Sequence, residues 1–374
     1  MEYNKFIYNL YYKWWKNIDK FIFSVIVLLF VIGLFFSLVS TSLLVSDKLN
    51  TNDYAFFFKH LSFVFLGIII IFILSSINEE KLFKISPSIF LISLISLILV
   101  PIIGIEVNSA QRWIDLYFLP RFQPIEIVKP FLIILISLIL SNEKYTNVYL
   151  KYTFSFLITL IIALLLAAQP DIGQTLLVFF SWSVLIFISG INIIFLIISC
   201  LILSTVLYFS INLVPRFAYI KNRILSFFNT ETGTHNAQSE KAIDSITSGG
   251  YFGKGIGEGT LKNRVPEAHT DYIISVISEE FGVIAIILIL LMFLILIYSV
   301  FKKVYLENEE RNKLVLVGCV SLILLQAMIH IGVNIRLFPT TGMTLPFISY
   351  GGSSIISISI LSGIILNLTK RKIS

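Results

Sequence analysis

Charged residues are scarce in this chain. Asp, Glu, Lys and Arg make up only 13% of its 374 residues, whereas 57% are hydrophobic. A soluble globular domain carries about a quarter charged residues because its surface faces water, so this composition excludes an ordinary soluble protein. Uncharged runs such as 21–39 and 283–297 have the length of a bilayer's hydrocarbon core. We therefore predict an all-α integral membrane protein, with residues 1–374 forming a single polytopic domain.

Cysteine is nearly absent, and metal-ligand patterns are missing. The two cysteines, Cys200 and Cys319, lie inside apolar runs, which excludes a disulfide framework. The sequence has no zinc-ligand spacing and no nucleophile elbow, so no protein-bound metal site is predicted. The glycine-rich run 249–259 lacks the spacing of a phosphate-binding loop and has no Ser or Thr after Lys254. It therefore predicts no nucleotide binding.

Apolar segments are what the chain has in abundance. Each is long enough to cross a bilayer, and together they predict a bundle of about ten transmembrane helices. The first has no small-residue cleavage pattern, so we interpret it as a retained helix and not as a signal peptide. The segments lie at roughly 20–45, 56–77, 82–103, 124–141, 151–168, 172–189, 191–213, 272–300, 313–335 and 345–369.

Basic residues predict the orientation of this bundle. They cluster at the ends of apolar segments, which is typical of a membrane protein and not of nucleic-acid binding. With about ten spans they all fall on one side, which the positive-inside rule makes cytoplasmic, together with both termini. Residues 214–270 are polar and Gly-rich, and they predict one large extracytoplasmic loop between helices seven and eight. The basic residues are Lys5, Lys13, Lys16, Lys20, Lys81, Lys84, Lys144, Lys151, Lys302, Lys303, Arg311, Lys313, Lys370, Arg371 and Lys372.

Ionisable and polar side chains inside membrane helices are costly and mark candidate sites. Glu126 and Lys129 are three residues apart and share a helix face. Two interpretations remain open: an internal ion pair, or contact between Lys129 and an anionic substrate. Gln326, His330 and Asn334 recur every four residues, and we predict that they hydrogen-bond neighbouring helices.

Three further polar groups lie in predicted outer connections. Trp113, next to Arg112, suits either an interfacial anchor or a platform for a substrate. Asp171 precedes an apolar run, and the local pattern favours a role in capping the helix that follows.

Asp271 stands where the polar loop meets predicted helix eight. Helix capping is the local interpretation. The helix dipole would also favour its ionised form, which suits a general base. Glu279 and Glu280 lie about 12 Å further along the helix. We expect at least one of them to pair with a cation, with Lys129 or Arg336 as the candidates.

Seven motifs in order carry a resemblance that covers nearly the whole chain. The sequence resembles the SEDS family (shape, elongation, division and sporulation), whose members are bacterial peptidoglycan glycosyltransferases. The wording of the motifs is nearer to the cell-division branch than to the elongation branch. The motifs are Ala110–Ile114, Gln123–Lys129, Gln169–Gly173, Gly249–Gly253, Pro266–Asp271, Glu279–Gly282 and Leu345–Ser354.

This resemblance implies ten helices in the bacterial inner membrane, with both termini in the cytoplasm. It implies polymerisation of lipid II on the outer face of that membrane, for septal synthesis. The implied partners are a class B penicillin-binding protein, divisome proteins and membrane lipid. Asp271 matches the family's catalytic aspartate. We expect it to deprotonate the acceptor 4-hydroxyl, which then attacks the donor's anomeric carbon with inversion while undecaprenyl pyrophosphate leaves.

The resemblance also assigns roles to other residues. Arg112, Lys129 and Lys254 are candidate cations for the pyrophosphate, with a divalent ion such as Mg²⁺ or Mn²⁺ as a further candidate and no other cofactor expected. Trp113 would lie against a sugar face or the lipid. Further substrate contacts are expected from Gln169, Asp171, Glu258, Glu267 and His269. Structural ion pairs are expected from Glu126, Glu279, Glu280 and Arg336.

Three alternatives remain open. A lipid II flippase or another transporter would use the same bundle, although alternating access favours a site near the midplane and not an outward-facing Asp271. An elongation-branch polymerase would share the chemistry. A scaffold that only recruits a penicillin-binding protein would not need the Asp271 carboxylate.

Overall fold

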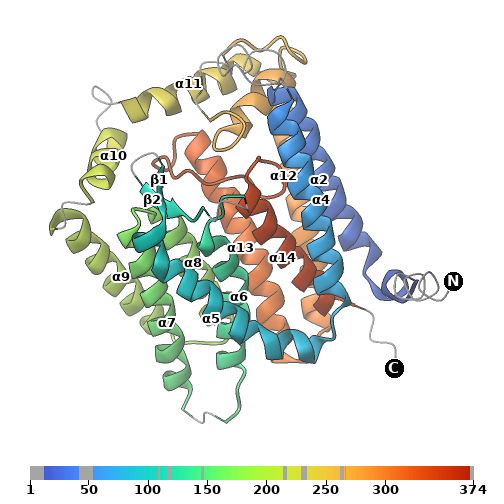
Figure 1. The fold of residues 1–374 in the computed structure, drawn as a ribbon, viewed down its shortest axis with the longest axis vertical. Coiled ribbons are helices and arrows are strands. Elements are labelled where there is room, and N and C mark those ends of the chain that lie inside the picture. The colour runs from blue at the N-terminus through green and yellow to red at the C-terminus, as the bar shows by residue number, and fades with distance from the viewer. Residues whose placement is uncertain are drawn as a thin grey trace.

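The computed structural model is a predominantly helical bundle (Figure 1). The structure describes residues 12–41, 54–107, 110–115, 120–144, 147–213, 217–228, 234–261, 265 and 267–370. Each predicted apolar segment coincides with a helix, which confirms the predicted fold class. The helices are α2 (Lys20–Thr41), α4 (Ala55–Ser76), α5 (Glu79–Ile103), α6 (Pro124–Leu140), α7 (Val148–Ala168), α8 (Ile172–Ile188), α9 (Ile193–Leu213), α12 (Ile273–Leu306), α13 (Glu310–Asn334) and α14 (Gly352–Leu368).

Length separates these helices into two groups. Within the described residues, 7 helices are long and apolar enough to cross a membrane: α2, α4, α5, α7, α9, α12 and α13. The helices α8 and α14 are apolar but shorter, and α6 also has 17 residues and carries Glu126 and Lys129. A helix of that length spans about 26 Å, close to the thickness of a hydrocarbon core. These three short helices are the largely buried centre of the bundle, where other helices cover them.

The bundle is apolar on its outside as well as inside. Phe65, Ile92 and Leu201 are each more than half exposed, at 66%, 66% and 61%. In water such a surface would drive aggregation, whereas lipid tails solvate it. This distribution is that of a multi-pass membrane protein.

Small residues let the central helices approach closely. A Cβ atom at Gly67 of α4 would lie 2.3 Å from the Ser359 hydroxyl of α14, and one at Gly363 of α14 would lie 2.8 Å from Leu74. Close packing of this kind replaces the hydrophobic effect, which is weak between helices in lipid. The tight turn between α8 and α9 uses Gly190 at φ +85°.

The region 214–270 is more ordered than its polar composition suggests. It contains α10 (Ala218–Phe228) and α11 (Thr234–Gly249), two helices that its polar composition did not predict. The helix α11 packs on α12. Figure 1 shows α10 and α11 at the same end of the bundle as the hairpin of β1 (Ile105–Val107) and β2 (Ala110–Trp113). Residues 214–216, 229–233, 262–264 and 266 of this region lie outside the described part.

Candidate active site

Asp271 lies in the turn immediately before α12. Its backbone N–H donates to the carbonyl of Glu267 at 3.1 Å, and its own carbonyl accepts from the Asn334 amide at 3.0 Å. The residue at the N-cap position of α12 is Tyr272, and that cap has no side-chain hydrogen bond. The local interpretation of Asp271 as a helix cap is therefore wrong. Its carboxyl group is held at the end of the bundle by backbone contacts and is left available for other partners.

The surroundings of the Asp271 carboxyl group favour its protonated form. Burial among packed groups, reinforced by the Glu267 carboxylate, raises the pKa of Asp271 to about 7, although Arg223 and Arg112 act in the opposite direction. We expected the helix dipole to favour the ionised form, and burial outweighs it. A carboxyl group with this pKa exchanges a proton near neutral pH, as a general base must.

Two arginines from distant segments converge on Asp271. Arg112, on β2, donates to the carbonyls of Gln169 and Pro170, and its Nε lies 3.5 Å from an Asp171 oxygen. Arg223, on α10, donates to the Thr340 hydroxyl. Both guanidinium groups lower the pKa of Asp271 and so lie within electrostatic reach of it. The site therefore combines β2, α10, the turn before α12 and the loop that follows α13.

Arg223 was not singled out from the sequence. It was one of several basic residues in the region 214–270, and no motif marked it. Only the fold of α10 brings it beside Asp271. The loop after α13 also approaches Asp271, because a Cβ atom added at Gly342 would lie 3.5 Å from an Asp271 carboxylate oxygen.

Glu126 and Lys129 form an internal ion pair, one of the two interpretations left open. The Lys129 ammonium lies 2.8 Å from Glu126 and 3.0 Å from the Gln174 side chain, and the Lys129 side chain is 0% exposed. Gln174 also donates to Glu126 at 2.9 Å, and Gln326 of α13 lies 3.5 Å from Lys129. The structure therefore places Lys129 inside the bundle in this ion pair, and its contact with an anionic substrate stays a prediction.

Asp171 caps α8, as its position suggested. It accepts from the Gln174 N–H at 3.4 Å and from the Gln123 side chain at 3.1 Å. Gln169 is 1% exposed and donates to a carbonyl of α5. The Gln169 carbonyl and the Asp171 carboxylate thus position the Arg112 guanidinium. Direct contact between these two residues and a substrate stays a prediction. Trp113 is half-buried at the end of β2 beside Arg112, and its predicted stacking role is likewise untested.

The helix α12 is broken at Gly282, and a loop fills the break. Gly282 has φ 77° and ψ −179°, which no α-helix contains. Two amides after the break and two carbonyls before it have lost their partners within the helix, and residues 250–255 supply new ones. The four bonds join Val283 to Gly250, Ile284 to Tyr251, Lys254 to Glu279 and Gly255 to Glu280, at 3.0, 3.3, 2.9 and 3.0 Å.

This loop also partners the two buried glutamates. Glu279 pairs with Lys254 at 3.2 Å and accepts from the Ser245 hydroxyl at 2.9 Å. Our expectation that Lys129 or Arg336 would pair with Glu279 or Glu280 is wrong, because Lys129 is engaged by Glu126 and Arg336 lies 3.5 Å from Glu240. Two backbone N–H groups, at residues 260 and 261, also donate to Glu279 at 2.9 Å, and one at residue 257 donates to Glu280 at 3.3 Å. Lys254, a predicted pyrophosphate contact, is thus already in an ion pair.

The remaining predicted residues surround Asp271 more loosely. His269 packs against Phe56, with ring centroids 4.7 Å apart, and burial lowers its pKa while Glu267 acts in the opposite direction. Glu267 is exposed and accepts from the Thr270 hydroxyl at 3.1 Å. Glu258 is exposed on the loop after α11. Substrate contacts from these residues stay predictions.

The described residues contain no cluster of side chains that could bind a metal ion. Among them, no three His, Cys, Asp or Glu side chains gather closely enough to hold an ion. Asp271 has one acidic neighbour in Glu267, but two guanidinium groups oppose a cation there. A divalent ion therefore stays a prediction.

Comparison with known proteins decides the family. The FtsW/RodA/SpoVE model, described as "cell cycle protein", matches residues 19–373. The chain belongs to this family. Two similar relatives are both named "Probable peptidoglycan glycosyltransferase FtsW". The one from Caulobacter vibrioides is 30% identical over 96% of this chain and 91% of that protein. The one from Haemophilus influenzae is 32% identical over 94% of this chain and 90% of that protein.

Two solved structures share this fold. A structure reported under the heading "structural coordination of polymerization and crosslinking by a peptidoglycan synthase complex" matches with a TM-score of 0.77 and 25% identity, covering 94% of this chain and 97% of that one. The Rod shape determining protein RodA of Thermus thermophilus matches with a TM-score of 0.70 and 25% identity, with the same coverage. The family predicted from the motifs is confirmed.

Proposed function

We propose that this protein polymerises lipid II into glycan strands on the outer face of the bacterial inner membrane, for septal synthesis in cell division. The names of its relatives support the activity and the division branch. The observation that carries the proposal is one carboxyl group, Asp271, with a pKa of about 7 and within electrostatic reach of Arg112 and Arg223. This group lies at the end of the bundle that the charge pattern assigns to the outside.

The proposed reaction forms one bond and breaks one. The acceptor 4-hydroxyl gives its proton to the Asp271 carboxylate, and its oxygen bonds to the donor's anomeric carbon from the face opposite the leaving group. The bond between that carbon and the pyrophosphate oxygen breaks with inversion. Undecaprenyl pyrophosphate leaves as an anion and needs no second carboxylic acid, unlike the leaving group of a glycosidase.

Arg112 and Arg223 are the cations best placed for the leaving pyrophosphate. Lys129 and Lys254 were the other candidates, but each is engaged by a glutamate. Arg112 is held by two carbonyls and Asp171, so its guanidinium is preorganised where negative charge develops. Arg223 replaces the two lysines in our proposal.

We further propose that both termini are cytoplasmic and that the protein works with a class B penicillin-binding protein and other divisome proteins. The clustering of basic residues supports the orientation. One solved relative comes from a complex that coordinates polymerisation with crosslinking. A flippase remains the competing function, and the experiment below separates the two.

The test is a polymerisation assay on purified protein given lipid II, alone and with its penicillin-binding protein. Asp271→Asn should lower the rate by at least about 100-fold, the usual contribution of a general base. Asp244→Asn is the matched control, because Asp244 is an exposed acid on α11 away from the site. A protein that moves lipid II across vesicles without joining it, or an Asp271→Asn variant that polymerises normally, would overturn the proposal.

A further inference from the structure

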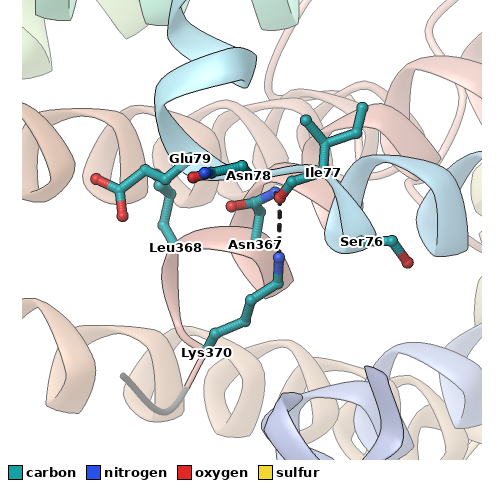
Figure 2. Close-up of a pocket in the computed structure, with 7 residues that line it drawn as sticks. All are labelled: Ser76, Ile77, Asn78, Glu79, Asn367, Leu368 and Lys370. Carbon is teal, nitrogen blue, oxygen red and sulfur yellow. Dashed lines mark hydrogen bonds between the residues drawn. The ribbon is translucent and has the colours of Figure 1, made fainter. Parts of the chain in front are cut away.

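A cavity lies at the end of the bundle opposite Asp271. It has a volume of about 280 Å³ and lies where α4, α5 and α14 meet (Figure 2). The length of α13 gives the distance between the cavity and Asp271. Arg311, near the start of α13, pairs with Glu79 of the cavity, and Asn334, at its end, contacts Asp271. Its 25 residues span about 37 Å, so this cavity is no part of the candidate active site. Its lining residues are Ser76, Ile77, Asn78, Glu79, Asn367, Leu368 and Lys370.

Among the described residues that line this cavity, Lys370 is the one cation. The Lys370 ammonium donates to the carbonyl of Ile77 at 3.1 Å, the bond drawn in Figure 2. An ammonium group has three N–H donors, and this is its one hydrogen bond within the described residues. Burial lowers the pKa of Lys370 to about 8, with Glu79 acting in the opposite direction. An anion brought against Lys370 would take up the remaining donors and stabilise the charge.

Two residues that line the same space carry acceptor oxygens. The amide N–H groups of Asn367 donate to the carbonyls of Leu74 and Ile77 at 2.6 and 2.9 Å, which fixes the side chain. Its oxygen is left without a donor among the described residues, although the residue is only 3% exposed. Leaving a buried acceptor without a donor is costly, and an N–H group from a ligand would remove that cost. Glu79 accepts through one oxygen, from Arg311 and Asn312 at 3.2 and 2.8 Å.

An apolar stripe leads away from the cavity along α4. Phe65, Ile69 and Ile73 are 66%, 40% and 52% exposed, and their spacing puts them on the helix face of Ser76, which lines the cavity. Such a stripe suits acyl chains. A ligand that matches both parts has a phosphate for Lys370, an N–H donor for Asn367 and Glu79, and hydrocarbon tails for the stripe.

We propose that this cavity binds the phosphoethanolamine headgroup of a membrane phospholipid. The phosphate contacts Lys370, and the primary ammonium donates to the Asn367 oxygen and to Glu79. The acyl chains lie along Phe65, Ile69 and Ile73 of α4. The headgroup thereby joins the ends of α4 and α5, which follow one another in the chain, to the end of α14, which is distant from both in sequence.

The test uses protein in nanodiscs with equal amounts of phosphatidylethanolamine, phosphatidylcholine and phosphatidylglycerol, and native mass spectrometry of the retained lipid. Phosphatidylcholine is the matched lipid, because it has the same phosphate and net charge but no N–H donor. Phosphatidylethanolamine should be retained about tenfold more than phosphatidylcholine, the effect of one hydrogen bond to a charged group. Equal retention of these two lipids, or preference for phosphatidylglycerol, would overturn the proposal.

Variants locate the binding. Lys370→Gln should lower the retention of phosphatidylethanolamine and of phosphatidylcholine alike, because both carry the phosphate, and Lys370→Arg should restore much of it. The control is Lys84→Gln, at an exposed lysine of α5 outside the cavity lining, which should leave retention unchanged. A thermal unfolding curve for each variant establishes that it is folded. Soluble glycerophosphoethanolamine should stabilise the protein less than the lipid does, and equal stabilisation would identify the soluble headgroup as ligand and overturn the lipid assignment.

Discussion

At the residue scale, the chemistry of Asp271 is decided by its neighbours. Its position before a helix favours ionisation, but burial and Glu267 raise its pKa to about 7. The two arginines limit this rise. A base that is half ionised near neutral pH can accept the acceptor's proton without needing a second activating group.

The first prediction concerns stability against pH. Because the pKa of Asp271 is raised from 3.8 to about 7, the folded protein holds a proton that the unfolded chain releases in this window. Its stability therefore falls as pH rises through the window and is level above it. Asp271→Asn removes this loss, so its gain in Tm over the native protein should be larger at pH 8 than at pH 5. Thermal unfolding in detergent measures both, and equal gains would contradict the raised pKa.

The second prediction concerns Arg223. Its positive charge lowers the pKa of Asp271, so Arg223→Gln should shift the acidic limb of the polymerisation rate profile to higher pH by roughly one unit. Arg223→Lys should largely preserve the profile. Lys221→Gln, at an exposed residue of the same helix, is the control. An Arg223→Gln variant whose rate falls equally at all pH values would assign Arg223 a purely structural role.

At the element scale, the break in α12 joins the loop after α11 to the helix that begins beside Asp271. The loop supplies the four backbone bonds lost at Gly282, and Lys254 pairs with Glu279. Without these bonds, unsatisfied backbone groups would lie at membrane depth, where each costs several kcal/mol. The loop therefore holds the first turns of α12 and, through them, Asp271.

The third prediction tests this break. Gly282→Ala should destabilise the protein strongly, because a Cβ atom there would lie 2.1 Å from the Tyr251 carbonyl oxygen, at φ 77°. Gly257→Ala is the control for backbone strain without a clash. Gly257 has a similar φ of 82°, but no atom lies within 4 Å of the position that its Cβ atom would take. We expect the control to cost about 1–2 kcal/mol and Gly282→Ala to cost more. Thermal unfolding of the two variants gives the comparison, and equal costs would mean that the loop can move aside.

At the scale of the whole molecule, a buried polar network ties the central helices together. Lys129 and Glu126 of α6 contact Gln174 of α8, Lys129 reaches Gln326 of α13, and Gln326 donates to the Ser354 hydroxyl of α14 at 3.3 Å. Of the hydrogen bonds to neighbouring helices predicted for Gln326, His330 and Asn334, the one from Gln326 is present. Asn334 donates instead to the carbonyl of Asp271 in the turn before α12, and a His330 ring nitrogen lies 2.7 Å from the Met343 carbonyl in the loop after α13. Apolar side chains alone would let these helices slide in lipid, whereas the network sets their register.

The fourth prediction tests this network. Lys129→Met should destabilise the protein by about 3–5 kcal/mol, because it leaves the Glu126 charge buried without its partner. Adding Glu126→Leu should restore most of that loss, since the paired charges are then replaced by apolar groups of similar size. Unfolding of the single and double variants measures the coupling. If the double variant were no more stable than Lys129→Met, the ion pair would not be the main interaction of Lys129.

The sequence predicted most of the architecture and little of the electrostatics. Apolar length specifies a membrane helix directly, because every backbone group must be satisfied within the segment. The family motifs likewise located Asp271 and Arg112. The ion-pair partners of Glu279 and Arg336 were predicted wrongly, because helical spacing tells which residues share a face and not which helix lies opposite.

What the sequence alone determined is thus the class of protein, the positions of its spans and the candidate base at Asp271, all of which depend on local composition and order. Only the tertiary structure decided the rest. It brought Arg223 from α10 to Asp271, inserted residues 250–255 into the break at Gly282, and enclosed Lys129 with Glu126. These contacts join residues distant in the chain, so their energies depend on how helices pack and not on any pattern within one segment.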